Sequence, residues 1–317
     1  MTVTQEQATW FADAFGKLVD NIDLAIVGKK PVIRLVVTAL ITEGHVLLED
    51  VPGTGKTVLA KSLANTLEST HSRIQFTPDL LPSDVTGVTI YNQGNGQFEF
   101  HKGPIFASVV LADEINRASP KTQSALLEVM EEGAVTVDGV GHPVGRPFMV
   151  IATQNPVEQA GTYKLPEAQL DRFLIKTSLG HPDRQTTVAL LLDAANRSRS
   201  SAVTAIVRPE MILTMAELAS QVFVDPSIVE YIAELVEATR TDKDTAIGSS
   251  MRGALALTRA AKTWALSLGR PYVTPDDIRA LAVPVLAHRL VVDPESEFAG
   301  VKAETIIERI LVDIAPP

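Results

Sequence analysis

The residues with the clearest chemical role form a glycine-rich turn with the sequence Pro52-Gly53-Thr54-Gly55-Lys56-Thr57. A short apolar run at 45–48 precedes the turn and a helical pattern follows it, which is the context of a phosphate-binding loop. The glycines allow backbone N–H groups to close around the β- and γ-phosphate oxygens of a nucleotide. Lys56 would bridge these phosphates, and the Thr57 hydroxyl would ligate Mg²⁺. The alternative is a glycine-rich turn that carries a surface lysine.

Position 50 departs from the strict loop pattern, because the pattern has a glycine there and this chain has Asp50. A carboxylate repels the negative charge of a triphosphate that lies beside it. Asp50 is therefore compatible with phosphate binding only if its side chain points away from the loop.

An acidic pair follows a second apolar run, since the segment 108–112 ends in Asp113-Glu114. The pair lies 113 − 56 = 57 residues beyond Lys56, which leaves room for a helix, a strand and a hairpin. In open α/β folds, ligands bind at the carboxyl ends of parallel strands. Asp113 would hold Mg²⁺ directly or through water, and Glu114 would polarise the attacking water as a general base. The alternative is a solvated strand end.

Three further residues could complete such a site. Asn155 follows another apolar run and would bind the γ-phosphate or orient water, although an Asn before Pro is also an ordinary turn signal. Arg172 could enter the site of a neighbouring subunit as an arginine finger, or form a local ion pair with Asp171 or Glu167. Arg252 could reach the γ-phosphate from the second domain, or be a surface cation.

The elements that position these residues are predicted by apolar runs that suit strands buried on both faces of a parallel sheet. The runs lie at 45–48, 73–76, 108–112, 148–153 and 173–178. Two stretches that alternate polar and apolar residues, 88–100 and 134–148, predict hairpins inserted into this frame. After residue 178 the strand signals stop and the periodicity is helical. The sequence thus predicts an α/β domain to about residue 180, followed by an all-helical domain.

Helix ends are also marked in the sequence. The segment 5–41 has a helical pattern that breaks at 28–31. Farther along, Ser119 suits an N-cap, Pro120 the first helical position and Gly133 the C-terminal cap, so a helix is predicted between them.

Composition excludes several other kinds of chemistry. The chain of 317 residues has no cysteine, which rules out disulfides, thiolate catalysis and cysteine-bound zinc. Its formal charge of -10 makes nucleic acid a poor partner. The N-terminus has no signal-peptide pattern and no apolar run is long enough for a membrane span. We therefore expect a cytoplasmic protein that meets a membrane at most through a partner.

Taken in order, these features resemble the MoxR family of AAA+ ATPases. The most specific matching segments are Gln75–Asp84, Gly103–Phe106, Leu111–Pro120, Ala152–Pro156 and Leu165–Phe173. Together they cover the α/β domain from about residue 20 to 180, and the helical remainder matches the family lid more loosely. One further position departs from the family pattern, because the usual Val-Gly-Gln of the adenine pocket is Val27-Gly28-Lys29 here.

The resemblance implies a P-loop NTPase core at 1–182 and a helical lid domain at 183–317. The core would be a three-layer αβα structure with a five-stranded parallel sheet and hairpin inserts at about 88–100 and 134–148. By this resemblance, Lys56 and Thr57 would belong to the Walker A motif, and Asp113 and Glu114 to the Walker B motif. Asn155 would be sensor 1 and Arg252 sensor 2. Arg172 would be the arginine finger. The implied contacts to ATP or ADP are Val27, Gly28, Pro52, Gly53, Thr54, Gly55, Lys56, Thr57, Val58 and Arg252.

The sequence therefore predicts Mg²⁺-dependent ATP hydrolysis at subunit interfaces, driving a chaperone-like change in a client protein. The resemblance implies a homo-oligomer, usually a hexamer, and a partner with a von Willebrand factor A domain. Asp50 motivates a competing hypothesis, a nucleotide-gated scaffold with little hydrolysis. The chain could also be the motor subunit of a metal chelatase, or a DNA helicase or loader, which the acidic charge disfavours.

Overall fold

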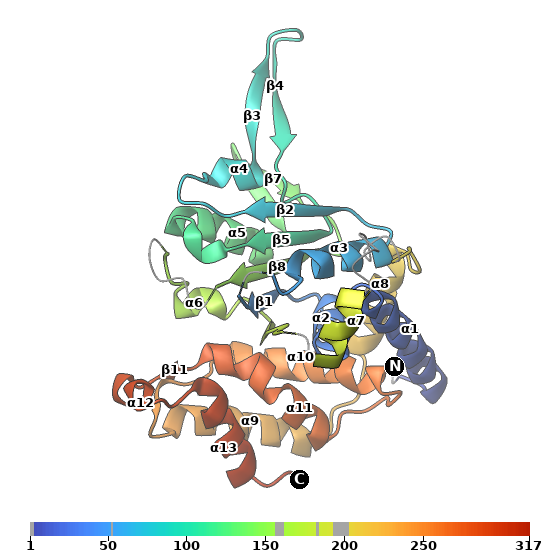
Figure 1. Ribbon diagram of the computed structural model, residues 1–317, viewed down its shortest axis with the longest axis vertical. Coiled ribbons are helices and arrows are strands. Elements are labelled where there is room, and N and C mark those ends of the chain that lie inside the picture. The colour runs from blue at the N-terminus through green and yellow to red at the C-terminus, as the bar shows by residue number, and fades with distance from the viewer. Residues whose placement is uncertain (1–2, 52, 156–161, 182–183, 193–202) are drawn as a thin grey trace.

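A five-stranded parallel sheet forms the centre of the N-terminal half of the protein (Figure 1). The computed structural model describes residues 3–51, 53–155, 162–181, 184–192 and 203–317. The strand order is β2-β5-β8-β1-β9, and all four strand pairs are parallel. The strands are β1 (Val46–Glu49), β2 (His71–Gln75), β5 (Val109–Asp113), β8 (Met149–Gln154) and β9 (Ile175–Thr177). Each of the five predicted apolar runs is confirmed as a strand of this sheet.

Helices cover both faces of the sheet, which gives three layers. Alternate residues of β5 enter two different apolar clusters, because successive side chains of a strand point to opposite faces. Val109 and Leu111 pack with one cluster, whereas Val110 and Ala112 pack with the other. The first cluster includes α1 (Gln5–Asp23), α2 (Lys30–Ile41) and α3 (Lys56–Thr66), and the second includes α5 (Pro120–Glu132).

The helix α5 begins and ends at the residues that the sequence indicates. The Ser119 hydroxyl accepts a hydrogen bond from the backbone N–H of Thr122 at 3.4 Å, and Pro120 is the first helical residue. Gly133 caps the other end in the left-handed conformation, with φ of 63°. A break between the first two helices is also present, but it lies at 24–29 and not at 28–31, because α1 ends at Asp23 and α2 begins at Lys30.

Both predicted hairpins are present. One consists of β6 (Ala134–Val137) and β7 (Val140–Pro143), and the other of β3 (Gly87–Asn92) and β4 (Gln97–Lys102). The hairpin β3–β4 follows the short helix α4 (Pro82–Thr86) and projects far from the body (Figure 1). Its base requires glycine, because a Cβ on Gly87 would lie 2.3 Å from the carbonyl oxygen of His101.

The C-terminal half is mainly helical. Its elements are α7 (Arg184–Leu192), α8 (Pro209–Ser220), α9 (Pro226–Thr241), α10 (Met251–Ser267), α11 (Pro275–Leu286), α12 (Pro294–Phe298) and α13 (Ala303–Asp313). The all-helical prediction is wrong in one detail, because β10 (Thr245–Ile247) and β11 (Val291–Val292) form a small antiparallel sheet. Strands of three and two residues are too short to give a periodic signal.

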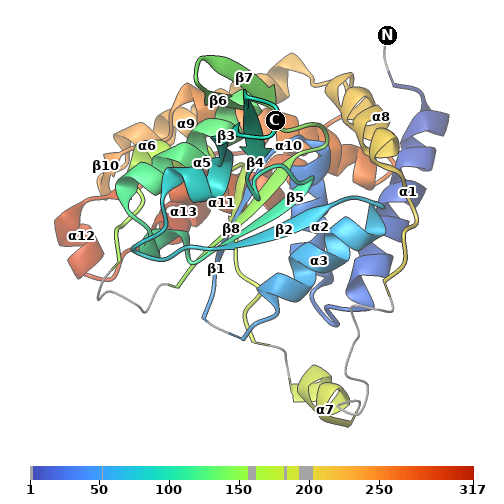
Figure 2. The same cartoon turned by 90° about the horizontal axis from the view of Figure 1, so that it is seen from above.

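One continuous apolar cluster joins the two halves. The helices α8 and α10 contribute to the same cluster as α1 and α2, whereas α7 stands apart from this body (Figure 2). The predicted boundary between residues 182 and 183 lies outside the described residues, so these limits stay a prediction. Within the described part of the chain, every helix is too short or too polar to cross a membrane.

Candidate active site

The glycine-rich turn leads directly into the first turn of α3. Gly53 and Gly55 adopt φ values of 87° and 98°, in the left-handed region that favours glycine. A Cβ on Gly53 would meet no atom within 4 Å, so the loop has open space beside it. No side chain of the described residues caps the start of α3, which leaves its first N–H groups for an anion. Pro52 lies outside the described residues.

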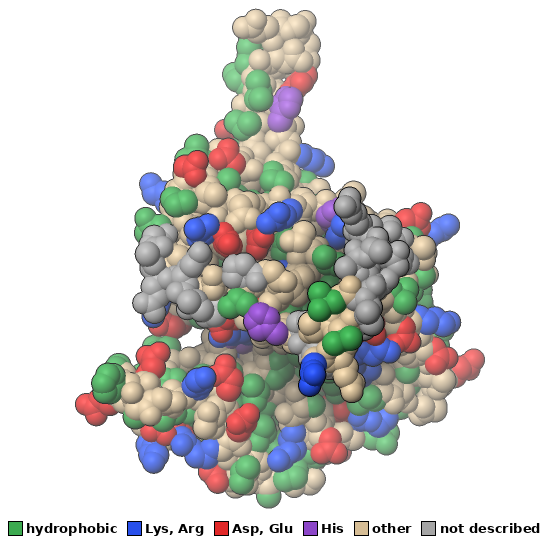
Figure 3. All heavy atoms as spheres, viewed as in Figure 1, with side chains coloured by type: hydrophobic (Ala, Val, Ile, Leu, Met, Phe, Trp, Pro, Cys, Tyr) green, Lys and Arg blue, Asp and Glu red, His purple; other side chains and the backbone are tan. Residues whose placement is uncertain are grey.

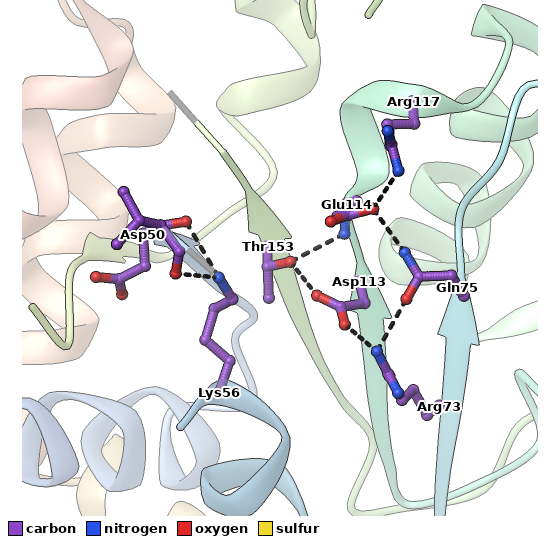
Figure 4. Close-up of polar contacts among 9 residues, drawn as sticks. Asp50, Lys56, Arg73, Gln75, Asp113, Glu114, Arg117 and Thr153 are labelled. Carbon is purple, nitrogen blue, oxygen red and sulfur yellow. Dashed lines mark hydrogen bonds and ion pairs between the residues drawn. The ribbon is translucent and has the colours of Figure 1, made fainter. Parts of the chain in front are cut away.

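Lys56 is held by the loop itself. Its Nζ donates to the backbone carbonyl oxygens of Asp50 at 3.1 Å and Val51 at 3.0 Å (Figure 4). A phosphate group that entered the loop would compete for the same ammonium protons. Thr57 is exposed in the first turn of α3, whereas Val58 is half-buried against the apolar cluster beneath the sheet.

The Asp50 side chain is turned away from Lys56 (Figure 4). Asp50 is only 4% exposed. Its carboxylate accepts hydrogen bonds from the Ser178 hydroxyl at 2.8 Å, from the Leu179 N–H at 2.7 Å and from the Gly180 N–H at 2.8 Å. Its negative charge therefore points toward the end of β9, as phosphate binding in the loop requires.

Asp113 and Glu114 lie at the carboxyl end of β5, with β8 between them and β1. Asp113 is buried, and its two oxygens accept from the Thr153 hydroxyl and from the Arg73 guanidinium, both at 2.6 Å. The Thr153 hydroxyl also accepts from the backbone N–H of Glu114 at 2.9 Å. Thr153 thus fixes both members of the acidic pair.

The Glu114 carboxylate accepts from the Gln75 side-chain amide at 2.7 Å and from Arg117 at 3.0 Å (Figure 4). Gln75 reaches it because β2 pairs with β5 in a register that places Gln75 opposite Asp113. Sequence reasoning missed Thr153, Arg73, Gln75 and Arg117 as site residues. The signal available for Gln75, Arg117 and Thr153 was their place within the family-specific segments.

Asn155 follows β8 at the same edge of the sheet and is buried. The structure therefore brings together Lys56, the acidic pair and Asn155, which follow β1, β5 and β8. Loop N–H groups, an ammonium, a hydroxyl and carboxylates are the groups that bind a nucleoside triphosphate with Mg²⁺. The donor set fits that ligand, with Thr57 and Asp113 as the metal-binding candidates.

The predicted adenine turn lies against the phosphate loop. A Cβ on Gly55 would lie 3.7 Å from the Ile26 side chain, so the turn between α1 and α2 is next to the loop. Gly28 has φ of 78°, and a Cβ there would lie 2.9 Å from the Thr186 hydroxyl of α7. Val27 is half-buried beside it. The Lys29 ammonium donates to the carbonyl oxygen of His181 at 2.8 Å.

Arg172 and Arg252 meet in a different place. Both bind Glu131 of α5, Arg172 at 2.8 Å and Arg252 at 3.0 Å. They line a cavity of about 320 Å³ that contains no described residue of the phosphate loop. The structure thus groups Arg252 with Arg172 and not with Lys56. A local ion pair with Asp171 or Glu167 was the alternative role for Arg172; the structure instead pairs Arg172 with Glu131 and Asp171 with the buried Arg289.

Two family models match the chain. Residues 45–175 match the model described as "ATPase family associated with various cellular activities (AAA)", and residues 237–310 match the "AAA lid domain". The protein YeaC of Bacillus subtilis, which is uncharacterized, is 48% identical over 95% of this chain and 94% of its own. Chaperone MoxR1 of Mycobacterium tuberculosis is 40% identical over 92% of this chain and 79% of its own.

A solved structure and a more distant relative complete the comparison. The crystal structure of a candidate ATPase from Cytophaga hutchinsonii has a TM-score of 0.91 and 40% identity, covering 98% of this chain and 97% of that chain. A magnesium-chelatase 38 kDa subunit from Acidiphilium rubrum is 29% identical over 75% of this chain and 67% of its own.

Proposed function

The chain belongs to the MoxR family of AAA+ ATPases, and we propose that it hydrolyses Mg²⁺-bound ATP at the interfaces of a ring-shaped homo-oligomer, a hexamer. The energy would remodel or mature a client protein, together with a partner that carries a von Willebrand factor A domain. The observation that carries this proposal is the meeting of Lys56, Asp113 and Glu114 at one edge of the sheet. The cytoplasmic location stays a prediction.

Each residue at this edge has a role in the proposed reaction. Lys56 leaves the carbonyl oxygens of Asp50 and Val51 and binds the β- and γ-phosphates of ATP. Thr57 and Asp113 would hold the Mg²⁺ that accompanies ATP, which would supply positive charge beside the phosphates. Glu114 accepts a proton from the attacking water, and Asn155 orients that water or the γ-phosphate.

We assign Arg172 and Arg252 to the nucleotide of a neighbouring subunit. The pair lines a cavity apart from the phosphate loop, so within one chain it is grouped with Glu131 and not with Lys56. A guanidinium supplied in trans stabilises the charge of the transferred phosphoryl group. In a ring with head-to-tail contacts, each subunit presents one surface to the next subunit and a different surface to the previous one.

The client contact is assigned to the projecting hairpin β3–β4. Four apolar side chains along it are exposed: Val88, Ile90, Tyr91 and Phe98. Apolar side chains are visible along the projection in Figure 3. An apolar surface of this kind is a common site of protein contact.

The experiment that tests the proposal mixes two variants. Glu114→Gln removes the general base and leaves ATP binding intact, so turnover falls by about 10²-fold or more. Arg172→Ala removes the residue that acts in trans, and turnover falls by about 10³-fold. A mixture of both restores activity, because about a quarter of randomly formed interfaces carry an intact Glu114 and an intact Arg172 from different subunits.

Phosphate release is measured for each variant alone and for the mixture. Glu132→Gln and Arg208→Ala, two exposed positions of the same residue types, serve as controls and should match the parent. Full activity of Glu114→Gln would show that Glu114 is not the general base. A mixture that does not recover activity would show that Arg172 does not act in trans.

Two competing functions make different predictions. The scaffold hypothesis depends on Asp50, whose carboxylate is turned away from Lys56; it predicts ATP binding with no phosphate release. The chelatase hypothesis draws on the more distant relative; it predicts stimulation of ATP hydrolysis by porphyrin-loaded partner subunits.

A further inference from the structure

The two positions that depart from the family pattern, Asp50 and Lys29, bind the same short segment at 178–181. Asp50 accepts from the Ser178 hydroxyl and from the N–H groups of the next two residues. Lys29 donates to the carbonyl oxygen at the end of the segment at 2.8 Å. One contact comes from the start of the phosphate loop and the other from the predicted adenine turn, so the segment is held from both sides of the nucleotide site.

The buried Asp50 carboxylate depends on this segment. A buried carboxylate is costly unless it is hydrogen-bonded, and Asp50 receives three hydrogen bonds of 2.7 to 2.8 Å. Two of the donors are the backbone N–H groups of Leu179 and Gly180. The Asp50 carboxylate therefore holds the main chain of the segment as well as the Ser178 side chain. The Leu179 N–H is itself buried and would lose its partner without Asp50.

The backbone of Asp50 is tied to the reacting groups. Its carbonyl oxygen accepts from Lys56 Nζ at 3.1 Å, and its N–H donates to the carbonyl oxygen of Gln154 at 3.2 Å. Lys56 is the residue whose ammonium changes partner when a phosphate enters the loop. Lys56 and the segment 178–181 are thus bound to the same residue, Lys56 through the carbonyl oxygen of Asp50 and the segment through its carboxylate.

The segment leads toward α7, which contacts the adenine turn. A Cβ on Gly28 would lie 2.9 Å from the Thr186 hydroxyl of α7. The helix α7 otherwise stands apart from the body (Figure 2). Asp50 and Lys29 thus fasten the described chain before α7 at the phosphate end and at the adenine end of the site.

We propose that Asp50 and Lys29 are positioning residues that couple nucleotide binding to the segment 178–181. With nucleotide bound, both contacts would hold the segment more firmly, and the segment in turn would fix the loop and the adenine turn for the nucleotide. The proposal rests on the proposed ATP site. It gives Asp50 and Lys29, the two residues that depart from the family pattern, one shared function.

The experiment measures hydrogen exchange at the Leu179 and Gly180 amides of the full chain, with and without ADP, together with the dissociation constant for ADP. In the parent protein, ADP should increase the protection of both amides. Asp50→Asn keeps the shape but replaces one acceptor oxygen by a donor, so it should reduce this increase and weaken ADP binding by about tenfold. Lys29→Gln, which restores the usual family residue, should do the same to a smaller extent.

A second readout separates positioning from general damage to the fold. The effect of Asp50→Asn should fall more on KM than on kcat, because the Asp50 carboxylate contacts the segment 178–181 and not Lys56. The double variant Asp50→Asn/Lys29→Gln should lose less ADP affinity than the sum of the single effects, because both residues act on one segment. Asp276→Asn and Lys17→Gln, at exposed positions, are the matched controls.

The outcomes are distinct. A parent protein that fails to bind ADP would overturn the proposed function and the coupling with it. A parent that binds ADP, with Asp50→Asn and Lys29→Gln equal to it in exchange and affinity, would overturn the coupling alone. If Asp50→Asn does not fold, Ser178→Ala removes a single donor, and unchanged exchange and affinity in that variant would count against the proposal.

Discussion

Arg172 and Arg252 bind opposite oxygens of one carboxylate, although Arg172 lies just before β9 of the sheet and Arg252 lies in the first turn of α10. Arg172 contacts Oε2 of Glu131 and Arg252 contacts Oε1. Two like charges are held side by side because the carboxylate lies between them. The pair therefore behaves as one unit whose geometry depends on Glu131.

We expect Glu131→Ala to reduce turnover by about tenfold, because the two guanidinium groups then repel each other and lose their alignment. ATP binding should be unchanged. The measurement compares kcat and the dissociation constant for ATP with those of Glu132→Ala, the next residue along the helix. Equal kcat in Glu131→Ala and the parent would show that the carboxylate does not organise the pair.

Thr153 is expected to matter for both stability and turnover. Its buried hydroxyl donates to Asp113 and accepts from the N–H of Glu114. Thr153→Val keeps the volume but leaves both groups without this partner, which should cost about 1–3 kcal/mol in the free energy of unfolding. Urea unfolding and phosphate release check the two effects. Thr153→Ser restores the hydroxyl and should recover both, and a valine variant as stable and active as the parent would contradict the assignment.

The ion pair between Asp171 and Arg289 should be sensitive to the loss of one partner. Arg289 is buried and also donates to the carbonyl oxygens of Phe173 and Val285. Burial lowers the pKa of its guanidinium, and the neighbouring Asp171 carboxylate opposes that shift. Asp171→Leu leaves a buried charge without its counterion and should destabilise the fold by about 3–5 kcal/mol.

The double variant Asp171→Leu/Arg289→Met removes both charges and should be more stable than Asp171→Leu alone. Thermal or urea unfolding of the three proteins makes the comparison. A double variant less stable than the single one would indicate that the other hydrogen bonds of Arg289 outweigh the missing counterion.

Two buried histidines should make the protein less stable in mild acid. Burial lowers the pKa of His45 to about 4 and that of His288 to about 3. His45 Nδ1 accepts from the Val150 N–H and its Nε2 faces the Met130 carbonyl oxygen, so the ring is neutral and a second proton would oppose Val150. In the unfolded chain both rings bind a proton near pH 6.5.

Between about pH 6.5 and pH 4 the unfolded state therefore binds more protons, and stability falls as the pH falls. The slope should be about 1.4 kcal/mol per pH unit for each histidine. Urea unfolding at a series of pH values measures it. His45→Gln should reduce the slope by about 1.4 kcal/mol per pH unit, the contribution of one histidine. An unchanged slope in His45→Gln would show that this ring is not the titrating group.

The sequence predicts the strands that carry the site, but it does not predict the side-chain contacts between them. Apolar runs predict the five strands because strands buried on both faces need apolar side chains at nearly every position. They carry no information on which strands are neighbours, so the approach of Gln75 to Glu114 and of Thr153 to Asp113 was missed. These contacts depend on the order β2-β5-β8 and on its register.

Contacts between distant segments were missed for the same reason. The local partners expected for Arg172 were neighbours in sequence, whereas its partner Glu131 lies on α5. The orientation of Asp50 likewise follows from N–H groups that the end of β9 supplies. The sequence indicates that a charged side chain needs a partner if it is buried. Which residue becomes that partner depends on how distant segments pack together.

The base of the hairpin β3–β4 is formed by directly paired residues, since Gly87 lies opposite Lys102. The chain thus leaves and re-enters the core at points about 5 Å apart, the spacing of neighbouring strands. The hairpin is therefore an interchangeable module. Shortening it to a tight turn, or exchanging it for a different loop with a paired base, should leave Gly87 and the sheet in place.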